Sequence, residues 1–137
     1  MVRIKYDATI LNYISLFESL TGARVKDCIV DDNLLFIIKN GDMGLAIGRN
    51  GSSLKRVEDT LKKPIKIIEF DEDIVKFIRN YVFPLRKLEI EKEEKTVKIK
   101  GQDMKTKGLL IGRDRSNLKR MTVIVKRFFD VDNITVV

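Results

Sequence analysis

The chain lacks histidine altogether and has a single cysteine, Cys28, among its 137 residues. Without histidine it lacks the most common general base and metal ligand. One thiol cannot form an internal disulfide bond or a zinc site, so we expect a reducing, cytoplasmic compartment and a buried, inert Cys28. No apolar run approaches the roughly 18 residues of a membrane-spanning helix. The first residues also lack the apolar core of a secretory signal, so we expect no membrane partner.

Motifs for binding small phosphate ligands are missing as well. A Walker-type loop needs Gly-Lys-Ser/Thr, which neither glycine-bounded loop contains. A dinucleotide fingerprint needs its glycines directly after a strand, and Gly41, Gly44 and Gly48 do not have that spacing. No carboxylate pair or cluster of metal-ligand residue types occurs near a glycine-bounded site. We therefore predict a protein that is not an enzyme, with no catalytic residue, cofactor, metal or small-molecule substrate.

A segment of 13 residues occurs twice, 64 residues apart. Gly44-Leu-Ala-Ile-Gly-Arg-Asn-Gly-Ser-Ser-Leu-Lys-Arg56 returns as Gly108-Leu-Leu-Ile-Gly-Arg-Asp-Arg-Ser-Asn-Leu-Lys-Arg120, and nine positions are identical. A repeat of this kind indicates two copies of one small unit. The boundary falls near Asp71 with almost no linker, which predicts domains at 1–71 and 72–137 that are rigidly coupled.

Positive charge is concentrated on the repeated segment and the helix after it. The whole chain has a net charge of +7, while residues 44–66 carry +4 and residues 105–127 carry +7. The rest of the chain is therefore acidic, with a net charge of −4. Such local concentration is typical of a protein that binds a polyanion.

Hydrophobic periodicity predicts the same element order in both halves: helix, strand, strand, short helix, loop, longer helix, strand. In the first half we expect a helix at 8–21, strands at 25–30 and 34–39, a short helix at 43–47, a longer helix capped by Ser52, and a strand at 65–70. In the second half we expect a helix from the acidic residues 71–73 to Pro84, strands at 85–91 and 96–100, a short helix before Gly112, a longer helix from Ser116, and a strand at 133–137.

The repeated loop has the features of a phosphate-chain clamp. Gly48 and Gly51 lack a Cβ, so another backbone can pass close to them. The helix beginning at Ser52 directs its N–H groups and positive dipole end at the loop. Arg49 adds a cation, and an apolar floor of Leu45, Ile47 and Leu54 would accept bases.

This element order, with Ile-Gly-Arg-Asn-Gly at the helix junction, resembles the K-homology (KH) domain, in which a Gly-x-x-Gly loop clamps about four single-stranded nucleotides. A helix at the start and a strand at the end resemble the prokaryotic, type II arrangement. Two such units filling the chain resemble archaeal members of the NusA family of transcription factors. The resemblance implies an α/β (α+β) fold of two tandem KH domains, each a three-stranded sheet packed by helices. It implies single-stranded RNA as the partner in transcription termination or antitermination, and it alone suggests RNA polymerase as a second partner.

The resemblance places the RNA-binding residues on both copies: Gly48, Arg49, Asn50, Gly51, Lys55, Arg56, Gly112, Arg113, Asp114, Arg115, Lys119 and Arg120. Arg115 departs from the family pattern, because it replaces the second glycine. It can block the close backbone approach, or it can add an ion pair to a phosphate. We expect the first loop to be the better clamp and the second unit to contribute mostly electrostatic affinity.

Other interpretations of the same features remain open. The same fold serves in ribosome assembly, and basic loops also bind acidic protein surfaces. The charged segment from Glu89 to Lys100 is typical of an exposed hairpin. Five aromatic residues lie on apolar stripes, and we expect most of them to pack in the core rather than stack on bases. They are Tyr6, Tyr13, Tyr81, Phe128 and Phe129.

Overall fold

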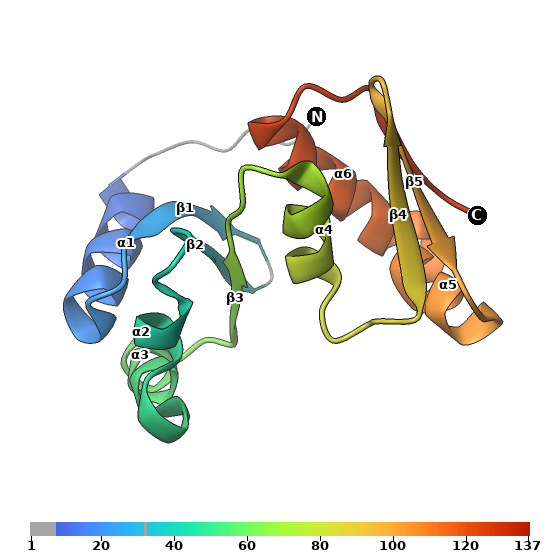
Figure 1. Cartoon of the computed structure of the whole chain (residues 1–137). Helices are drawn as coiled ribbons and strands as arrows, with labels where there is room; N and C mark the ends of the chain where they lie inside the picture. The colour runs from blue at the N-terminus through green and yellow to red at the C-terminus, as the bar shows by residue number, and fades with distance from the viewer. Residues whose placement is uncertain (1–7, 32) are drawn as a thin grey trace. The chain divides into compact units, whose positions relative to one another are not determined.

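The computed structural model describes residues 8–31 and 33–137. Two compact units are seen, one ending at Asp71 and the other beginning at Glu72 (Figure 1). The expectation for Tyr6 and the assignment of residues 1–7 to the first domain fall outside the described residues. Each unit contains a three-stranded sheet covered by helices, as the sequence predicts.

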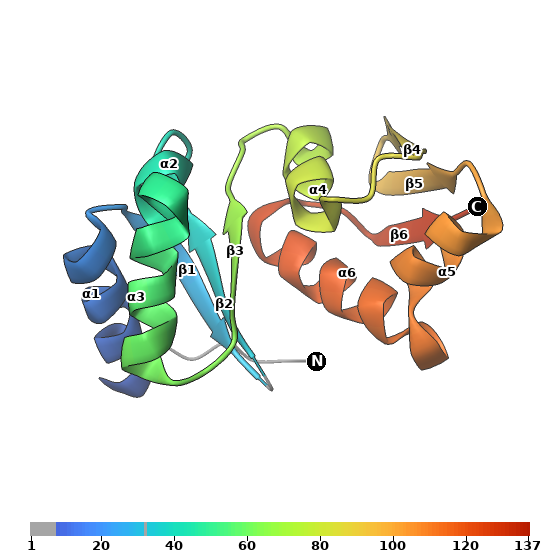
Figure 2. The same cartoon turned by 90° about the horizontal axis from the view of Figure 1, so that it is seen from below.

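In the first unit, β1 and β2 are antiparallel, and β3 pairs in parallel with β2 to give the order β1-β2-β3. Helices α1 and α3 lie on one side of this sheet (Figure 2). The elements are α1 (Ala8–Thr21), β1 (Val25–Val30), β2 (Leu34–Ile38), α2 (Met43–Ile47), the 3₁₀ turn η1 (Arg49–Gly51), α3 (Ser52–Leu61) and β3 (Ile65–Glu69).

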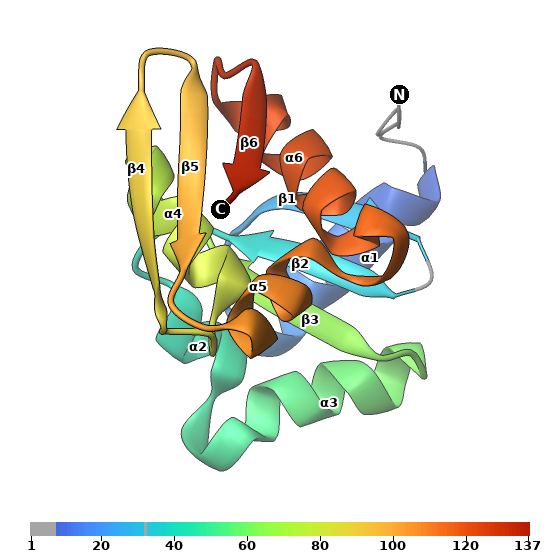
Figure 3. The ribbon, with the colours of Figure 1, turned by 90° about the vertical axis from the view of Figure 1, so that its right-hand side faces the viewer.

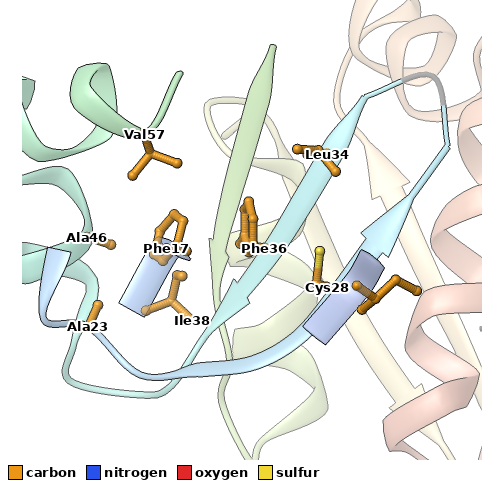
Figure 4. Packing of buried hydrophobic residues seen from close by; sticks show 9 residues of the cluster. Phe17, Ala23, Cys28, Leu34, Phe36, Ile38, Ala46 and Val57 are labelled. Carbon is orange, nitrogen blue, oxygen red and sulfur yellow. The ribbon is translucent and has the colours of Figure 1, made fainter. Parts of the chain in front are cut away.

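The core of this unit forms where alternate residues of β2 face the helices. Phe36 stacks on Phe17 of α1 with ring centroids 4.4 Å apart, and Val57 of α3 and Ala46 of α2 close the same cluster (Figure 4). Each large apolar side chain buried here stabilises the fold by roughly 1.5–3 kcal/mol. This packing holds α2 and α3, the two helices that flank the first loop.

The second unit repeats the topology. β4 and β5 are antiparallel and β6 pairs in parallel with β5, so the sheet order is β4-β5-β6 (Figure 3). The elements are α4 (Ile74–Val82), β4 (Leu88–Glu93), β5 (Thr96–Gly101), α5 (Met104–Ile111), η2 (Arg113–Arg115), α6 (Ser116–Phe128) and β6 (Asn133–Val136). The predicted element order is therefore confirmed in both halves.

The β4–β5 hairpin has one buried and one charged face. Leu88, Ile90, Val97 and Ile99 are buried. The alternate residues are exposed and carry both charge signs, and Lys100 Nζ lies 3.1 Å from Glu91 Oε1. The hairpin is exposed as predicted, and its balanced charges make it a solvated face.

Two local predictions were wrong. β4 begins at Leu88 and not at residue 85, because turns follow α4: Leu85 N donates to Val82 O, and Leu88 N donates to Arg86 O. Ser52 does not cap α3. The N-cap is Gly51, no side chain accepts a capping hydrogen bond, and Ser52 already has helical angles (φ −65°, ψ −39°). A capping serine needs a non-helical backbone, which Ser52 lacks.

Cys28 is fully buried, as predicted. Burial, with a smaller contribution from the neighbouring Asp27 carboxylate, raises the pKa of its thiol to about 12. The reactive thiolate is therefore disfavoured. Phe77 contacts Phe128 and Phe129 with ring centroids 5.9 and 5.6 Å apart, so this aromatic group packs internally.

Among residues 8–31 and 33–137, no helix has the length and apolar character needed to cross a membrane. The same residues contain no group of three or more acidic, cysteine or histidine side chains arranged to hold a metal ion.

Candidate nucleic-acid interface

The first loop links α2 to α3 through a backbone with several positive φ angles. Gly48 ends α2 with φ 75° and ψ 176°. Asn50 follows at φ 56° and ψ 29°, and Gly51 at φ 75° and ψ 13°. Three of the four loop residues thus have positive φ, which turns the chain sharply between the helices. Arg49 and Asn50 in this turn are exposed.

Gly48 is also required by space. A Cβ on Gly48 would lie 2.7 Å from both the Cβ and the backbone N of Ser53 and would collide with the hydroxyl of that residue. The first turn of α3 therefore packs directly against the glycine backbone. In contrast, a Cβ on Gly51 would meet nothing within 4 Å, so that side of the loop is open.

The second loop has the same backbone. Gly112 has φ 75° and ψ 174°, Asp114 has φ 57° and ψ 29°, and Arg115 has φ 64° and ψ 19°. A Cβ on Gly112 would lie 2.6 Å from Cγ of Asn117, whose amide donates to Leu109 O at 2.9 Å. Arg115 thus occupies the left-handed conformation that glycine occupies in the first loop. The repeat aligns Arg115 with that glycine, but an arginine does not by itself predict left-handed angles, because Arg has no preference for that region.

We predict that Arg115→Gly will stabilise the protein by about 1 kcal/mol, because a non-glycine residue in the left-handed region is strained by roughly that amount. Urea unfolding of the full chain measures the change. Gly51→Ala is the matched control: its Cβ has open space, so only backbone strain acts and a loss of similar size is expected. Unchanged midpoints for both variants would contradict the strain at this position.

Most of the predicted cations are accessible. Arg49, Lys55, Arg56, Arg113, Arg115 and Lys119 are exposed, and within residues 8–31 and 33–137 none of them forms an ion pair. Arg120 differs from its counterpart Arg56, because it is half-buried and engaged in an interaction. The structure thus gathers Gly48 to Gly51 with Lys55 and Arg56 at one helix junction, and Gly112 to Arg115 with Lys119 at the other.

Apolar side chains border both loops. Leu45 of α2 is 52% exposed and its counterpart Leu109 of α5 is 48% exposed, while Ile47 is 39% exposed. Exposed apolar groups beside a basic loop suit the faces of nucleotide bases. Leu54 is half-buried, so it contributes less of this surface than the sequence predicted.

Two aspartates that the sequence analysis did not single out accept backbone hydrogen bonds just before the helices that lead into the loops. Asp42 precedes α2 and Asp103 precedes α5. Arg24 N donates to Asp42 Oδ2 at 2.9 Å, and this bond is the main reason that the pKa of Asp42 is lowered. Thr106 N donates to Asp103 Oδ1 at 2.7 Å and likewise lowers the pKa of Asp103. Asp103 could have been found as an N-cap, since it lies just before α5.

The chain is similar to known proteins over nearly its whole length. A family profile described as the KH domain matches residues 12–80. The probable transcription termination protein NusA of Methanococcus vannielii is 37% identical, covering 99% of this chain and 81% of the relative. This chain belongs to the NusA family. The Halococcus morrhuae member of the NusA family is 32% identical over 97% of this chain and 98% of its own length.

A solved structure extends this result to three dimensions. The crystal structure of APE1850 aligns with a TM-score of 0.73 and 29% identity, covering 96% of this chain and 99% of that one. The NusA-family resemblance and the predicted fold of two tandem KH domains are thereby confirmed. The roles of individual loop residues are not addressed by these similarities and remain predictions.

Proposed function

We propose that this chain binds single-stranded RNA through KH domains at 1–71 and 72–137 and acts in transcription termination or antitermination. The observation that carries the proposal is the shared geometry of the two loops. Each begins with a glycine near φ 75° and ψ 175°, exposes an Arg next, and leads into a basic helix. The NusA-family relatives are named probable transcription termination proteins, which supports a role of this binding in termination.

In this proposal the first loop is the main clamp. Gly48 and Gly51 allow an RNA backbone to approach, Arg49 and Asn50 contact it, and Lys55 and Arg56 neutralise phosphates one turn along α3. Leu45 and Ile47 accept bases beside the loop. All of these contacts are available on one exposed helix junction.

The second loop contributes mainly charge. Gly112 and Asp114 keep the loop shape, and the second unit supplies its own cations in Arg113, Arg115, Lys119 and Arg120. Arg115 presents a side chain where Gly51 leaves open space, which favours a phosphate ion pair over close backbone approach.

The remaining parts of the proposal rest on family membership. RNA polymerase is the protein partner that a transcription factor of this family requires, and the cytoplasm is the compartment in which it would meet nascent RNA. The chain would act by binding and not by catalysis. Ribosome assembly, the main alternative for this fold, gains no support from the names of the relatives.

A salt titration of binding to single-stranded RNA, single-stranded DNA and duplex RNA tests the proposal. We expect single-stranded RNA to bind most tightly and to remain bound at physiological salt. One loop that neutralises about four phosphates should give a log–log salt slope of roughly −3. Equal binding to all three nucleic acids that disappears with salt would indicate only a basic surface, and the proposal would fail.

A further inference from the structure

A third basic segment lies outside both loop regions. Residues 74–88 carry Lys76, Arg79, Arg86 and Lys87 and no acidic residue, and all four cations are exposed. Lys76 and Arg79 lie three residues apart on α4, and Phe83 follows four residues later, at the end of the helix. This spacing places the three on one side of α4. The segment therefore combines concentrated charge with an aromatic ring.

Phe83 is the only aromatic residue among those described that is classed as exposed, and its exposed fraction is 60%. Its backbone is held in place, because Phe83 N donates to Arg79 O at 3.1 Å and the following turn is closed by Leu85 N and Val82 O at 3.0 Å. The Arg86 guanidinium carbon lies 5.4 Å from the centroid of the ring. A flat ring is thus presented to solvent with a cation against it, at a fixed point of the fold.

The turn after α4 lies against the start of α5, where Lys87 meets an acidic residue. Lys87 O accepts from Gln102 N at 2.9 Å, so Lys87 lies beside the start of α5. There Asp103 caps α5 and lies 3.7 Å from Lys87 Nζ. Met104, the first residue of α5, is 81% exposed. The carboxylate is occupied by its own helix and a lysine, so it does not offset the remaining cations.

We propose that Phe83, Arg86, Lys76, Arg79 and Lys87 form a nucleotide-binding platform that is separate from the two loops. This inference rests on the proposed binding of single-stranded RNA. One base stacks on the Phe83 ring beside Arg86, the flanking phosphates contact Lys76 and Arg79, and Lys87 borders the platform in its ion pair with Asp103. Stacking on aromatic rings and Arg planes together with a basic track is the usual mode of binding for single strands.

The platform adds nucleotides to those held by the second loop. Its turn lies beside the N-terminal end of α5, and Gly112 follows the other end of that helix. Eight helical residues separate the two ends by about 12 Å. An acidic protein segment is the competing occupant. Its carboxylates would pair with the cations, but they would gain nothing from stacking on the exposed Phe83 ring. Bases fit that arrangement better.

A tryptophan probe tests the proposal directly, because the chain contains no Trp. In Phe83→Trp, we expect single-stranded RNA to quench the fluorescence of the indole, with saturation at the same concentration as binding. The control is Leu16→Trp, at an apolar position of α1 that is 40% exposed, and its emission should not change. Polyglutamate, a polyanion without bases, should leave both probes unchanged. An equal response of Phe83→Trp to polyglutamate would assign the surface to acidic polypeptides and overturn the proposal.

Affinity gives the second readout. Phe83→Ala should weaken binding of a single-stranded RNA of mixed sequence by about 5- to 100-fold, the range found for loss of one stacked base. Phe83→Tyr keeps the ring and should bind like the wild type. If Phe83→Ala binds normally while substitutions in the first loop abolish binding, the platform is wrong and the proposed function stands. If the unmodified protein does not bind RNA, both fail.

Discussion

A protein carrying Arg49→Asp and Asn50→Asp is expected to bind single-stranded RNA about 100-fold more weakly at fixed salt. Both residues are exposed in the first loop. Arg49 would change from a phosphate contact into a repelling charge, and Asn50 would lose a donor beside it. A binding isotherm on the full chain at physiological salt measures the loss.

This double variant should fold normally, and the chain itself supplies the reason. Asn50 has φ 56°, and the second loop holds an aspartate, Asp114, at the same position with φ 57°. An aspartate is therefore compatible with this backbone, and Arg49 makes no ion pair among the described residues that the change would break. Circular dichroism and urea unfolding should match those of the wild type.

A matched control separates a local effect from the change in net charge. Lys92→Asp with Asn12→Asp alters the charge by the same amount at two exposed positions, one on the β4–β5 hairpin and one on α1. We expect at most a few-fold loss of affinity from this control. If the control weakens binding as much as the loop variant, or if the loop variant binds normally, the first loop is not the clamp.

Gly48→Ala is expected to destabilise the protein by about 3 kcal/mol. Its angles, φ 75° and ψ 176°, lie in a region that essentially only glycine occupies, and occupying it costs other residues of order 1–3 kcal/mol. The new Cβ would also lie 2.7 Å from Ser53 N, a backbone atom that cannot rotate away. The loop and the start of α3 must therefore move. The midpoint of urea unfolding should fall in proportion.

Gly44→Ala, four residues earlier, is the control for this prediction. Gly44 lies inside α2, and a Cβ on it would meet nothing within 4 Å. Alanine is the better helix former, so this variant should be more stable by about 0.5–1 kcal/mol. The two substitutions have the same chemistry and opposite expected signs. Equal effects would mean that the angles and contacts of Gly48 do not constrain the loop.

The sequence predicts the architecture well, because most of its signals agree. The repeat indicates two units, and the bounds of α1, β1 and α2 follow from apolar periodicity and from turn residues such as Gly22 and Asn40. The clamp residues could be proposed because the sequence of the first copy contains both glycines of the Gly-x-x-Gly loop, Gly48 and Gly51. In each of these cases a residue type has one dominant physical role.

The other features of the site could not be predicted, because they depend on backbone angles and on exposure, which the residue type alone does not determine. The repeat aligns Arg115 with Gly51, but an arginine has no preference for left-handed angles, so the structure is needed to show that Arg115 adopts them. Ser52 has the composition of a cap but the backbone of a helix. Phe83 shares the charged side of α4 with Lys76 and Arg79, but only the structure shows that its ring is exposed with Arg86 against it. Burial at the end of a helix depends on where the chain goes next.

The common backbone of the two loops has a consequence for how such a protein can diversify. The same loop backbone holds Gly at the fourth position in one copy and Arg in the other, at a difference in folding free energy of about 1 kcal/mol. The last three loop residues of each copy can therefore be exchanged without changing the fold. One loop can gain a new side chain for binding while the other loop keeps the original residues. Transplanting Arg49-Asn50-Gly51 onto positions 113–115 should yield a chain with two equivalent tips, and it offers a direct way to ask what the difference between them is for.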